Sequence, residues 1–340
     1  MFVTDVAAHA DGGLLLAGYD TVSEQAVVIA FSKSGVAQWS HRTVPGGGTW
    51  INRVMTSPGS NAAVAVGWRE HAPGASEMVV RTLDGEDGSL IEDYVLAGAR
   101  DRWNAIYDLA FDDEAGFVAV GAKTAEDYDE PGVWFGRLDA DGLLVSEEIL
   151  RDAPDAWEWG KVVEADDRDV FLVLGEHFEE HAMLASTRAF MGRTELWEVG
   201  HSSATSRHRA RDVTILHDGT ILALYIAEEL DETFQYSLVQ ALSPEGFELW
   251  SQRYSDEIKV IRKLGDDGSW VAASEAGGRG LVRVSVGNGD EVWRDHIGTI
   301  GETSFSPAGV AVRDDAILVA GHVWDANGPK DSLVVEYSRL

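Results

Sequence analysis

Residues 14–18, Leu-Leu-Leu-Ala-Gly, open a series of short apolar runs that mostly end in a small residue. The series returns about every fifty residues along the whole chain. Its seven endpoints are Gly18, Gly67, Gly121, Gly175, Tyr225, Ser274 and Gly321. Repetition at a fixed period of this size is typical of repeat architectures, in which each copy is one supersecondary unit. The sequence therefore predicts seven equivalent units.

Each unit has the same internal order of strand-like segments and turns. In the first unit the segments are Val3–His9, Leu14–Ala17, Ala26–Phe31 and Val36–Thr43, separated by short runs rich in Gly, Asp and Ser. Alternating or fully apolar runs of this length, bounded by such turns, are typical of β-strands, and helical periodicity is essentially absent. Seven units of four antiparallel strands predict an all-β fold, a seven-bladed β-propeller.

Two other folds compete with the propeller. A β-sandwich rarely repeats its sequence seven times, and a parallel solenoid needs shorter coils of roughly 20 to 30 residues. We therefore interpret residues 1–340 as a single propeller domain. Its blades are expected near residues 1–48, 49–99, 100–153, 154–203, 204–255, 256–300 and 301–340.

The seventh unit is shorter than the others. It stops at Leu340, after its third strand, and Met1–Val3 belong to the first strand of the first unit. We expect the last blade to be three-stranded, or to be completed by residues outside this chain.

The chain is strongly acidic. It has 58 Asp and Glu residues against 27 Lys and Arg residues, a formal net charge of -31 over 340 residues. A field of this sign repels phosphate backbones, so nucleic acid is excluded as a partner. The acidity either keeps the protein soluble or attracts cations or a basic partner.

The chain contains no cysteine, which excludes disulfides, thiol catalysis and Cys-ligated metal sites. No window approaches the roughly 18 apolar residues of a membrane span. Met1 is followed at once by strand-like sequence and not by a basic start with an apolar run. The protein is expected to be cytoplasmic, or secreted or at the cell surface if a leader was removed.

Three fourth strands carry the pattern Gly-x-x-x-Trp, which ends at Trp39, Trp250 and Trp293, and a variant one residue longer ends at Trp197. With the turns and the Leu-Leu-Ala-Gly ending, this pattern resembles the repeat family of bacterial surface β-propellers. It is also similar to the quinoprotein-like (PQQ-like) fold, and that resemblance implies tryptophans docked between neighbouring blades. Quinone-dependent enzymes of that fold use a vicinal cysteine pair and a calcium-linked acid set. The chain has no cysteine and no acid set that maps onto theirs, so the resemblance concerns the fold.

A candidate binding site lies 16 to 18 residues before each endpoint, where the first strand of each unit begins. That position holds Phe2, Trp50, Trp103, Trp157, His208, Glu257 and Phe305, and the basic residues Arg102, Arg207 and Arg209 adjoin it. Flat side chains at the rim of a propeller channel could stack on a sugar, a peptide or a cation, and arginine could hold a carboxylate. The alternative is that these rings pack between blades.

The loops between second and third strands are expected on the same face and collect acidic and His residues. They hold Trp68, Glu70, His71; Glu126, Asp127, Asp129, Glu130; Glu176, His177, Glu179, Glu180, His181; Glu228, Glu229, Asp231, Glu232; and His322, Trp324, Asp325. This face either binds a cationic ligand, a divalent metal ion or a basic segment, or is simply solvated.

One of these loops contains a metal-binding pattern. Residues 177–181 match H-x-x-E-H, a zinc pattern that works on a helix, but the segment falls between strands, so His177 and His181 are metal candidates only. The Asp-rich turns at residues 84–88 and 139–142 lack the ligand set of a calcium loop and are read as hairpin turns. No cofactor is predicted beyond the option of a divalent metal ion.

These observations favour a non-catalytic binding or scaffold propeller that presents an aromatic, acidic face to a protein or glycan partner. The predicted ligand-binding residues are Trp50, Trp103, Trp157, His208, Arg102, Arg209 and Phe305. No catalytic residue is predicted. The alternative is an enzyme that acts on a glycan or small molecule with acidic and His residues over the central channel.

Overall fold

The computed structural model is built entirely from β-strands over the part of the chain that it describes. That part comprises residues 1–57, 60–96, 102–112, 116–124, 131–150, 157–165, 170–179, 182–191, 194–201, 206–229, 235–277, 279–297, 303–313, 316–325 and 328–338. Contacts divide the chain into two compact units, Met1–Val163 and Glu164–Leu340, and each is described by itself.

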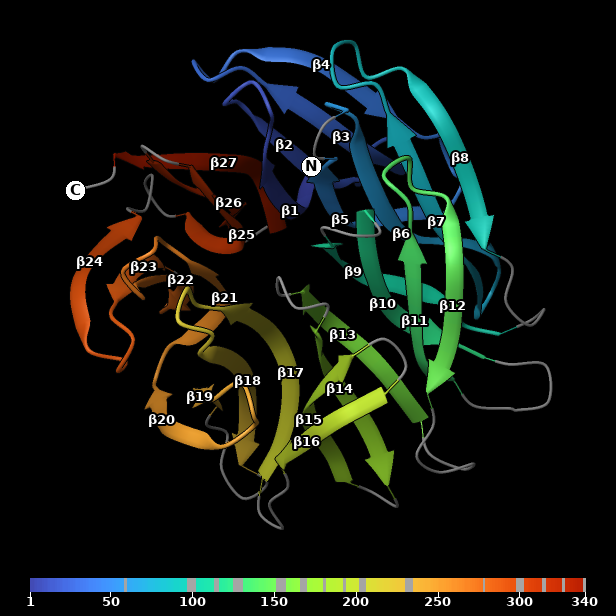
Figure 1. Cartoon of the computed structure of the whole chain (residues 1–340). Coiled ribbons are helices and arrows are strands. Elements are labelled where there is room, and N and C mark those ends of the chain that lie inside the picture. The colour runs from blue at the N-terminus through green and yellow to red at the C-terminus, as the bar shows by residue number, and fades with distance from the viewer. Residues whose placement is uncertain are drawn as a thin grey trace. The chain divides into compact units, whose positions relative to one another are not determined.

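The strands form successive antiparallel sheets, each made of consecutive strands (Figure 1). The first three sheets contain β1 (Phe2–Ala8), β2 (Leu14–Asp20), β3 (Gln25–Phe31) and β4 (Ala37–Arg42); β5 (Thr49–Thr56), β6 (Ala63–Ala72), β7 (Ala75–Leu83) and β8 (Leu90–Leu96); and β9 (Ala105–Asp112), β10 (Gly116–Lys123), β11 (Gly132–Leu138) and β12 (Leu144–Leu150).

The remaining sheets continue the same order, and the last of them has three strands. They contain β13 (Trp157–Ala165), β14 (Val170–Glu179), β15 (Ala182–Met191) and β16 (Thr194–His201); β17 (Ser206–Ile215), β18 (Ile221–Glu229), β19 (Gln235–Leu242) and β20 (Glu248–Tyr254); β21 (Glu257–Lys263), β22 (Trp270–Ala276), β23 (Arg279–Ser285) and β24 (Glu291–Ile297); and β25 (Ser304–Arg313), β26 (Ala316–Asp325) and β27 (Gly328–Ser338).

This organisation is that of a seven-bladed β-propeller with four-stranded antiparallel blades and a three-stranded last blade, as the sequence predicts. Each sheet falls within one of the seven predicted residue ranges. The single-domain organisation of residues 1–340 stays a prediction. Among the residues described above, no helix has the length and apolar character to cross a membrane.

The glycine that ends the repeated apolar run has a steric role. In six first strands the pairing shifts by one residue, which leaves a β-bulge at Thr4, Asn52, Tyr107, Arg211, Lys259 and Ala308. The residue before each bulge lies opposite the endpoint of the run, and a Cβ on Gly67 would lie 1.9 Å from the carbonyl oxygen of Trp50. The same clash, at 2.0 to 2.3 Å, would occur at Gly18, Gly121 and Gly321. At these four positions glycine recurs because the bulged strand passes too close for a side chain, whereas Tyr225 and Ser274 occupy the same register in the fifth and sixth blades.

Three of the six bulged side chains bridge adjacent first strands. Thr4 Oγ1 donates to the carbonyl of Ile51 at 2.7 Å, and Asn52 Nδ2 donates to the carbonyl of Ile106 at 2.6 Å. In the second unit Arg211 Nε donates to the carbonyl of Lys259 at 3.0 Å. A bulge re-aims one side chain out of the regular alternation, and here it aims that side chain at the next sheet.

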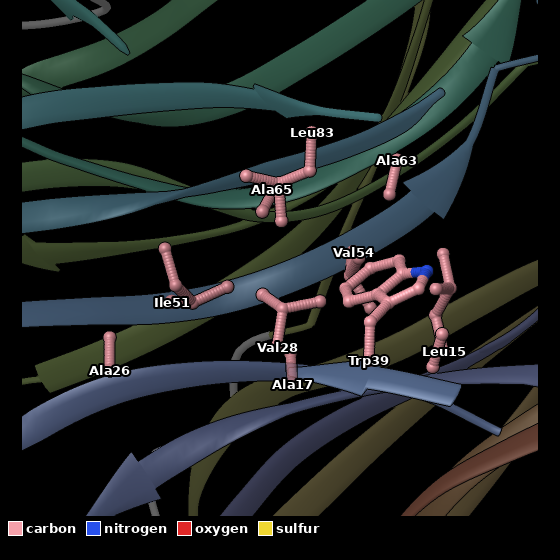
Figure 2. Packing of buried hydrophobic residues seen from close by; sticks show 11 residues of the cluster. Leu15, Ala17, Ala26, Val28, Trp39, Ile51, Val54, Ala63, Ala65 and Leu83 are labelled. Atoms are coloured by element: carbon pink, nitrogen blue, oxygen red, sulfur yellow. The ribbon is translucent and has the colours of Figure 1, made fainter. Parts of the chain in front are cut away.

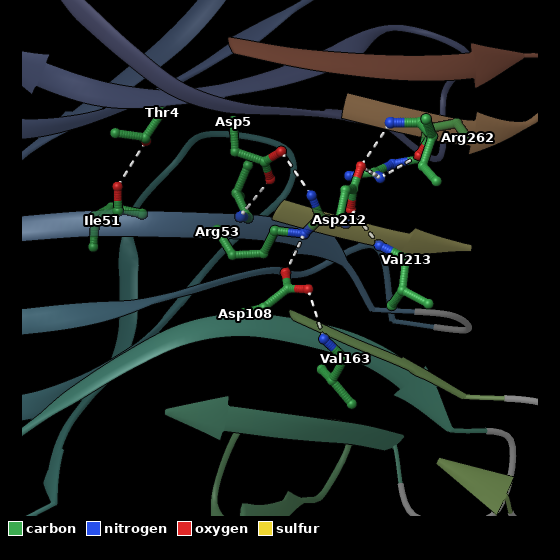
Figure 3. Close-up of polar contacts among 11 residues, drawn as sticks. Thr4, Asp5, Ile51, Arg53, Asp108, Val163, Asp212, Val213 and Arg262 are labelled. Atoms are coloured by element: carbon green, nitrogen blue, oxygen red, sulfur yellow. Dashed lines mark hydrogen bonds and ion pairs between the residues drawn. The ribbon is translucent and has the colours of Figure 1, made fainter. Parts of the chain in front are cut away.

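The residue after the bulge adds a buried carboxylate in three sheets (Figure 3). Asp5 accepts the backbone N–H of Val54 at 3.0 Å, and Asp108 accepts that of Val163 at 3.0 Å. The guanidinium of Arg53 lies between these two acids, 2.9 Å from each. Because Asp5 and Asp108 are almost fully buried, their charges are compensated by these donors and not by water.

The second unit contains the same arrangement of a buried carboxylate and an arginine. Asp212 accepts the backbone N–H of Ile261 at 2.7 Å and pairs with the guanidinium of Arg262 at 2.6 Å (Figure 3). A carboxylate from one first strand thus holds the backbone of the next first strand in each unit.

Apolar clusters fill the space between consecutive sheets. Figure 2 shows one of them, in which Leu15, Val28 and Trp39 of the first sheet pack against Ile51, Val54, Ala65 and Leu83 of the second. Over the described residues the two central strands of the blades are mostly buried because both of their faces contact neighbouring sheets, and the third strands also bury charged side chains such as Arg81, Arg188 and Arg283.

The tryptophans of the Gly-x-x-x-Trp pattern dock on the following sheet, as the quinoprotein-like resemblance implies. Trp39 Nε1 donates to the carbonyl of Gly85 at 2.9 Å, Trp197 Nε1 to that of Pro244 at 2.9 Å, and Trp250 Nε1 to that of Gly287 at 2.8 Å. Each acceptor lies in the turn between the third and fourth strands of the next blade. The turn glycine is again constrained: a Cβ on Gly88, whose φ is 72°, would lie 2.5 Å from the ring of Trp39.

We expect Trp39→Ala to lower the free energy of unfolding by about 3 to 5 kcal/mol, because it removes a buried indole and leaves a cavity. Trp39→Phe keeps the ring but loses the bond to Gly85, and should cost about 1 to 2 kcal/mol. Urea denaturation measures both. Val36→Ala is the matched control, since Val36 lies just before the same strand and is exposed. Equal effects of the three substitutions would contradict the docking role.

We expect Arg53→Ala to lower stability by about 3 to 5 kcal/mol, because it leaves two buried carboxylates without their shared cation. Arg42→Ala removes an arginine from an exposed pair with Asp20 and should cost no more than about 1 kcal/mol. Thermal unfolding of the two variants side by side tests the difference. A loss of less than about 1 kcal/mol in Arg53→Ala would show that the bridge is dispensable.

Candidate functional site

Five aromatic side chains form a contiguous row in the first unit, which we call the aromatic row: Tyr19, Trp50, Trp68, Trp103 and Tyr107. Tyr19 and Trp50 stack with ring centroids 4.1 Å apart and planes at 8°. Trp50 and Trp68 stack at 5.8 Å and 15°. Trp68 meets Trp103 at 4.6 Å with planes tilted by 53°, and Trp103 Nε1 donates to the hydroxyl of Tyr107 at 3.0 Å.

Strand ends place these rings together. Trp50, near the start of β5, lies directly opposite Trp68 of β6 in the antiparallel register, and cross-strand partners project on the same face. Tyr19 lies near the end of β2, opposite Phe2 at the start of β1. Tyr107 is the bulged residue of β9, so its side chain leaves the regular alternation of that strand. The row therefore runs over three successive sheets.

Exposure differs along the row. Tyr19, Trp50, Trp68 and Tyr107 are half-buried, whereas Trp103 at the end is 36% exposed. Trp50 already has aromatic neighbours in Tyr19 and Trp68, so it supports the row more than it offers a free face. Trp103 is the ring most open to a ligand.

A buried asparagine holds the segment that carries Trp103. Asn104 Nδ2 donates to the carbonyls of Ser76 and Arg102 at 2.9 and 3.1 Å, and Asn104 Oδ1 accepts the backbone N–H of Thr124 at 3.0 Å. Asn104 is 1% exposed, so these bonds are shielded from water. The backbone on both sides of Trp103 is thereby fixed, which reduces the entropy lost when a ligand binds its ring.

Basic groups adjoin the row. The ammonium of Lys161 lies 4.2 Å from the centroid of the Tyr107 ring, a cation–π contact. Arg102 precedes Trp103 and is exposed. Arg69, next to Trp68, pairs with Glu77 at 2.8 Å. These groups can donate hydrogen bonds to a polar ligand that contacts the rings.

One acidic group beside the row in sequence, Asp20, is already bonded. Asp20, next to Tyr19, accepts bonds from Arg42 at 2.8 Å, from the Ser23 hydroxyl and from the backbone N–H of Val22. These donors, the Arg42 guanidinium first, hold the pKa of Asp20 well below its usual range. Asp20 is therefore ionised throughout the neutral range and is not a proton donor.

The structure places the other sequence-predicted residues as follows. Trp157 opens β13, and its side chain lies outside the described residues, as do the side chain of His177 and all of His181. His208, in β17, is buried. Arg209 follows it, half exposed, with Nη2 3.3 Å from Glu228 Oε1. Phe305 is 2% exposed and packs in the core of the second unit, where Cβ atoms on Gly280 and Gly321 would meet its ring.

Of the predicted aromatic positions whose side chains are described, Trp50 and Trp103 join the row, with Arg102 next to Trp103 in sequence. Sequence reasoning assigned Trp68 to a separate loop cluster and did not single out Tyr19, Tyr107 or Asn104. The direct pairing of Trp50 with Trp68 follows from the hairpin register and was accessible from the sequence. The acidic loop segments 126–130, 180–181 and 231–232 lie outside the described residues.

The Asp-rich turns act as hairpin turns. Asp84 Oδ1 accepts the backbone N–H of Glu86 at 2.8 Å, and Asp139 Oδ1 accepts those of Asp141 and Leu143 at 3.0 and 2.9 Å. Carboxylates that cap their own turns in this way stabilise the turn locally. Over the described part of the chain, no three His, Asp or Glu side chains are arranged to hold a metal ion.

Comparison with known proteins supports the fold. No family model and no curated protein matches the chain. Among solved structures, the chain is similar to the β-propeller domain of the Trilobed protease from Pyrococcus furiosus, described as having an open velcro topology, at 12% identity and a TM-score of 0.56, covering 99% of this chain and 97% of that one. These values support a propeller fold and, at this identity, nothing beyond the fold.

Two enzymes share the same fold. The polysaccharide lyase Uly1 gives a TM-score of 0.66 at 9% identity, covering 98% of this chain and 89% of that one. The quinohemoprotein alcohol dehydrogenase from Comamonas testosteroni gives 0.51 at 10% identity, covering 96% and 65%. The fold is therefore quinoprotein-like, and its neighbours have varied functions.

The burial of His322 in β26 makes the stability of the fold depend on pH. Burial lowers the pKa of His322 from 6.5 to about 4. The unfolded chain binds a proton near pH 6.5 and the folded chain only near pH 4, so this group removes stability as the pH falls through that window, by up to about 3 kcal/mol. We expect His322→Gln, which binds no proton, to lose less stability than the unsubstituted protein between pH 7 and pH 4. Parallel pH-dependent melting curves would contradict this.

Proposed function

We propose that this protein is a non-catalytic binding module that holds a glycan on the aromatic row, with Trp103 as the principal stacking ring. The observation that supports it most is the position of Trp103, an exposed indole on a rigid backbone at the end of a row of contiguous rings. An aromatic ring costs little conformational entropy when it is bound and offers a large apolar face.

Polar groups around the row suit the same ligand. Sugars present C–H faces to an aromatic ring and hydroxyls at their rims. Arg102 adjoins Trp103, and the ammonium of Lys161 covers the Tyr107 ring. Apolar surfaces with a few convergent polar groups are typical of binding sites for small molecules and saccharides. The similarity in fold to a polysaccharide lyase is consistent with a glycan ligand.

The alternative function is an enzyme that acts on a glycan. General acid catalysis at neutral pH needs a carboxyl group with a raised pKa. Asp20 has a lowered pKa, and Glu77 pairs with Arg69 at 2.8 Å. Two carboxylates close to the row in sequence, Asp20 and Glu77, thus pair with arginines, which favours binding over catalysis.

We expect Trp103→Ala to weaken glycan binding at least about tenfold, since stacking on an exposed ring is worth roughly 1 to 3 kcal/mol, while the melting temperature changes little. Trp103→Tyr retains a ring and should retain most of the affinity. Phe247→Ala is the matched control, because Phe247 is an exposed ring in a turn of the second unit. Titration of intrinsic fluorescence with a panel of neutral and acidic oligosaccharides measures the affinities.

Three results would contradict the proposal. If the protein binds another protein but no oligosaccharide, the ligand is not a glycan. If Trp103→Ala and Phe247→Ala lose glycan affinity equally, the aromatic row is not the binding site. A large loss of stability in Trp103→Ala would show that the ring packs and does not bind.

A further inference from the structure

The last sheet ends on a strand that elsewhere lies inside a blade. In the four-stranded sheets the third strand pairs with a strand on each side, whereas β27 pairs only with β26 over the described residues. β27 is therefore an edge strand with the sequence of an inner one. It belongs to the second unit and contains no residue of the aromatic row, so this inference does not rest on the proposed glycan site.

The apolar residues of β27 are less buried than their counterparts in the four-stranded sheets. Val334 pairs with Ala320 just as Val28 pairs with Ala17, Val239 with Leu224 and Val282 with Ala273, so these valines occupy the same position. Val28, Val239 and Val282 are at most 2% exposed. Val334 is only half-buried, as are Leu333 and Val335 beside it. The run Leu333-Val334-Val335 is thus built for two-sided burial that this sheet does not complete.

The fourth strands of the other blades are built as edges. β20 and β24 carry exposed Glu, Gln, Arg and Asp residues on both sides of a single half-buried tryptophan, with one exposed apolar residue each, Leu249 and Val292. Charged edge strands of this kind resist pairing with further chains. β27 lacks that protection along its apolar run, so it is the edge suited to strand addition.

Comparison with the first sheet shows which backbone N–H and carbonyl groups of β27 point to its open edge. In the first sheet the N–H and the carbonyl of Ala26 face Thr43, beyond the end of the fourth strand. Backbone direction alternates along a strand, so Val28 and Ala30 face the same side. Val334 and Glu336 occupy the positions of Val28 and Ala30, and their backbone groups point to the open edge.

The charge on this edge selects its occupant. In four blades the residue at the position of Glu336 is Ala30, Ala189, Ala241 or Val284, and each lies opposite the docked tryptophan of the fourth strand. Glu336 replaces this small apolar residue with a carboxylate that is half exposed and 3.0 Å from Arg313. A second copy of the chain would bring another Glu336 and a net charge of -31. A basic residue is the complementary partner at this position.

We propose that the open edge of β27 receives an extended, basic segment of another polypeptide as an antiparallel fourth strand. Main-chain hydrogen bonds to Val334 and Glu336 supply the affinity, and the basic side chain opposite Glu336 supplies the selectivity. Strand addition to an exposed sheet edge is a general mode of peptide recognition.

The test uses two labelled nine-residue peptides that copy Gly246–Tyr254, a fourth strand of this chain. The basic peptide carries Glu248→Lys and Trp250→Arg, and the acidic peptide carries Trp250→Glu. In the register of the fifth blade, position 250 falls opposite Glu336. We expect fluorescence anisotropy to show binding of the basic peptide and at least about fivefold weaker binding of the acidic one. Hydrogen exchange of the amides in residues 331–338 should slow when the basic peptide binds.

Two variants of the whole chain complete the design. Val334→Pro removes one outward N–H from an edge position that tolerates proline, and should abolish binding. Glu336→Lys keeps the backbone edge and should reverse the preference in favour of the acidic peptide. The proposal is overturned if neither peptide binds, if Glu336→Lys leaves the preference unchanged, or if light scattering shows a dimer that Val334→Pro dissociates, because a second copy would then occupy the edge.

Discussion

The β-bulge in the first strand, present in the six blades whose first pairing is described, is the constraint on which the rest of the structure depends. It brings the strand so close to its partner that the endpoint of the apolar run is glycine in four of the six described cases. It also aims the bulged side chain at the next first strand, where Thr4, Asn52 and Arg211 bond to backbone carbonyls. The residue that follows adds the carboxylate of Asp5, Asp108 or Asp212, which holds a backbone N–H of the same neighbour. One local irregularity therefore accounts for both the repeated sequence and the bonding between consecutive sheets.

In three blades a tryptophan of the outer strand also bonds to the following blade. Trp39, Trp197 and Trp250 each reach forward to a carbonyl in the next blade, and the facing turn carries a glycine where a side chain would collide with the indole. In the first and fifth blades, side chains thus bond to the sheet that follows both at its inner strand and at its outer turn. Stability of this kind is a sum over neighbouring repeats. The last described pair departs from the pattern, since Trp293 packs edge-on against Tyr337 with ring centroids 5.5 Å apart.

The fold was predictable from the sequence because its signals are local and repeated. The apolar runs, the turn residues and the Gly-x-x-x-Trp pattern each recur often enough to fix the strand order and the short last blade. The candidate site was predictable only in part. Counting back from each endpoint finds one residue per blade, so it found Trp50 and Trp103 but not Tyr107, whose side chain joins the row only because a bulge re-aims it. Asn104 was missed for a related reason: a buried asparagine gives no periodic signal, and its role appears only in the bonds it makes to the backbone of Ser76, Arg102 and Thr124.

Where one blade lacks a contact that the other blades repeat, its side chains are better candidates for function than for packing. At the bulge, Thr4 and Asn52 bridge to the next strand, but Tyr107 instead accepts a hydrogen bond from Trp103 and lies beneath the ammonium of Lys161. A ring that served only to fill space would be buried, as Trp39, Trp134 and Trp270 are. Trp103 keeps 36% of its surface exposed although the segment around it is fixed by buried bonds, and its ring contacts Trp68 and Tyr107 of the aromatic row. An exposed aromatic side chain on a rigid backbone, at the point where the repeat abandons its usual bridge, is better explained by a ligand than by the fold.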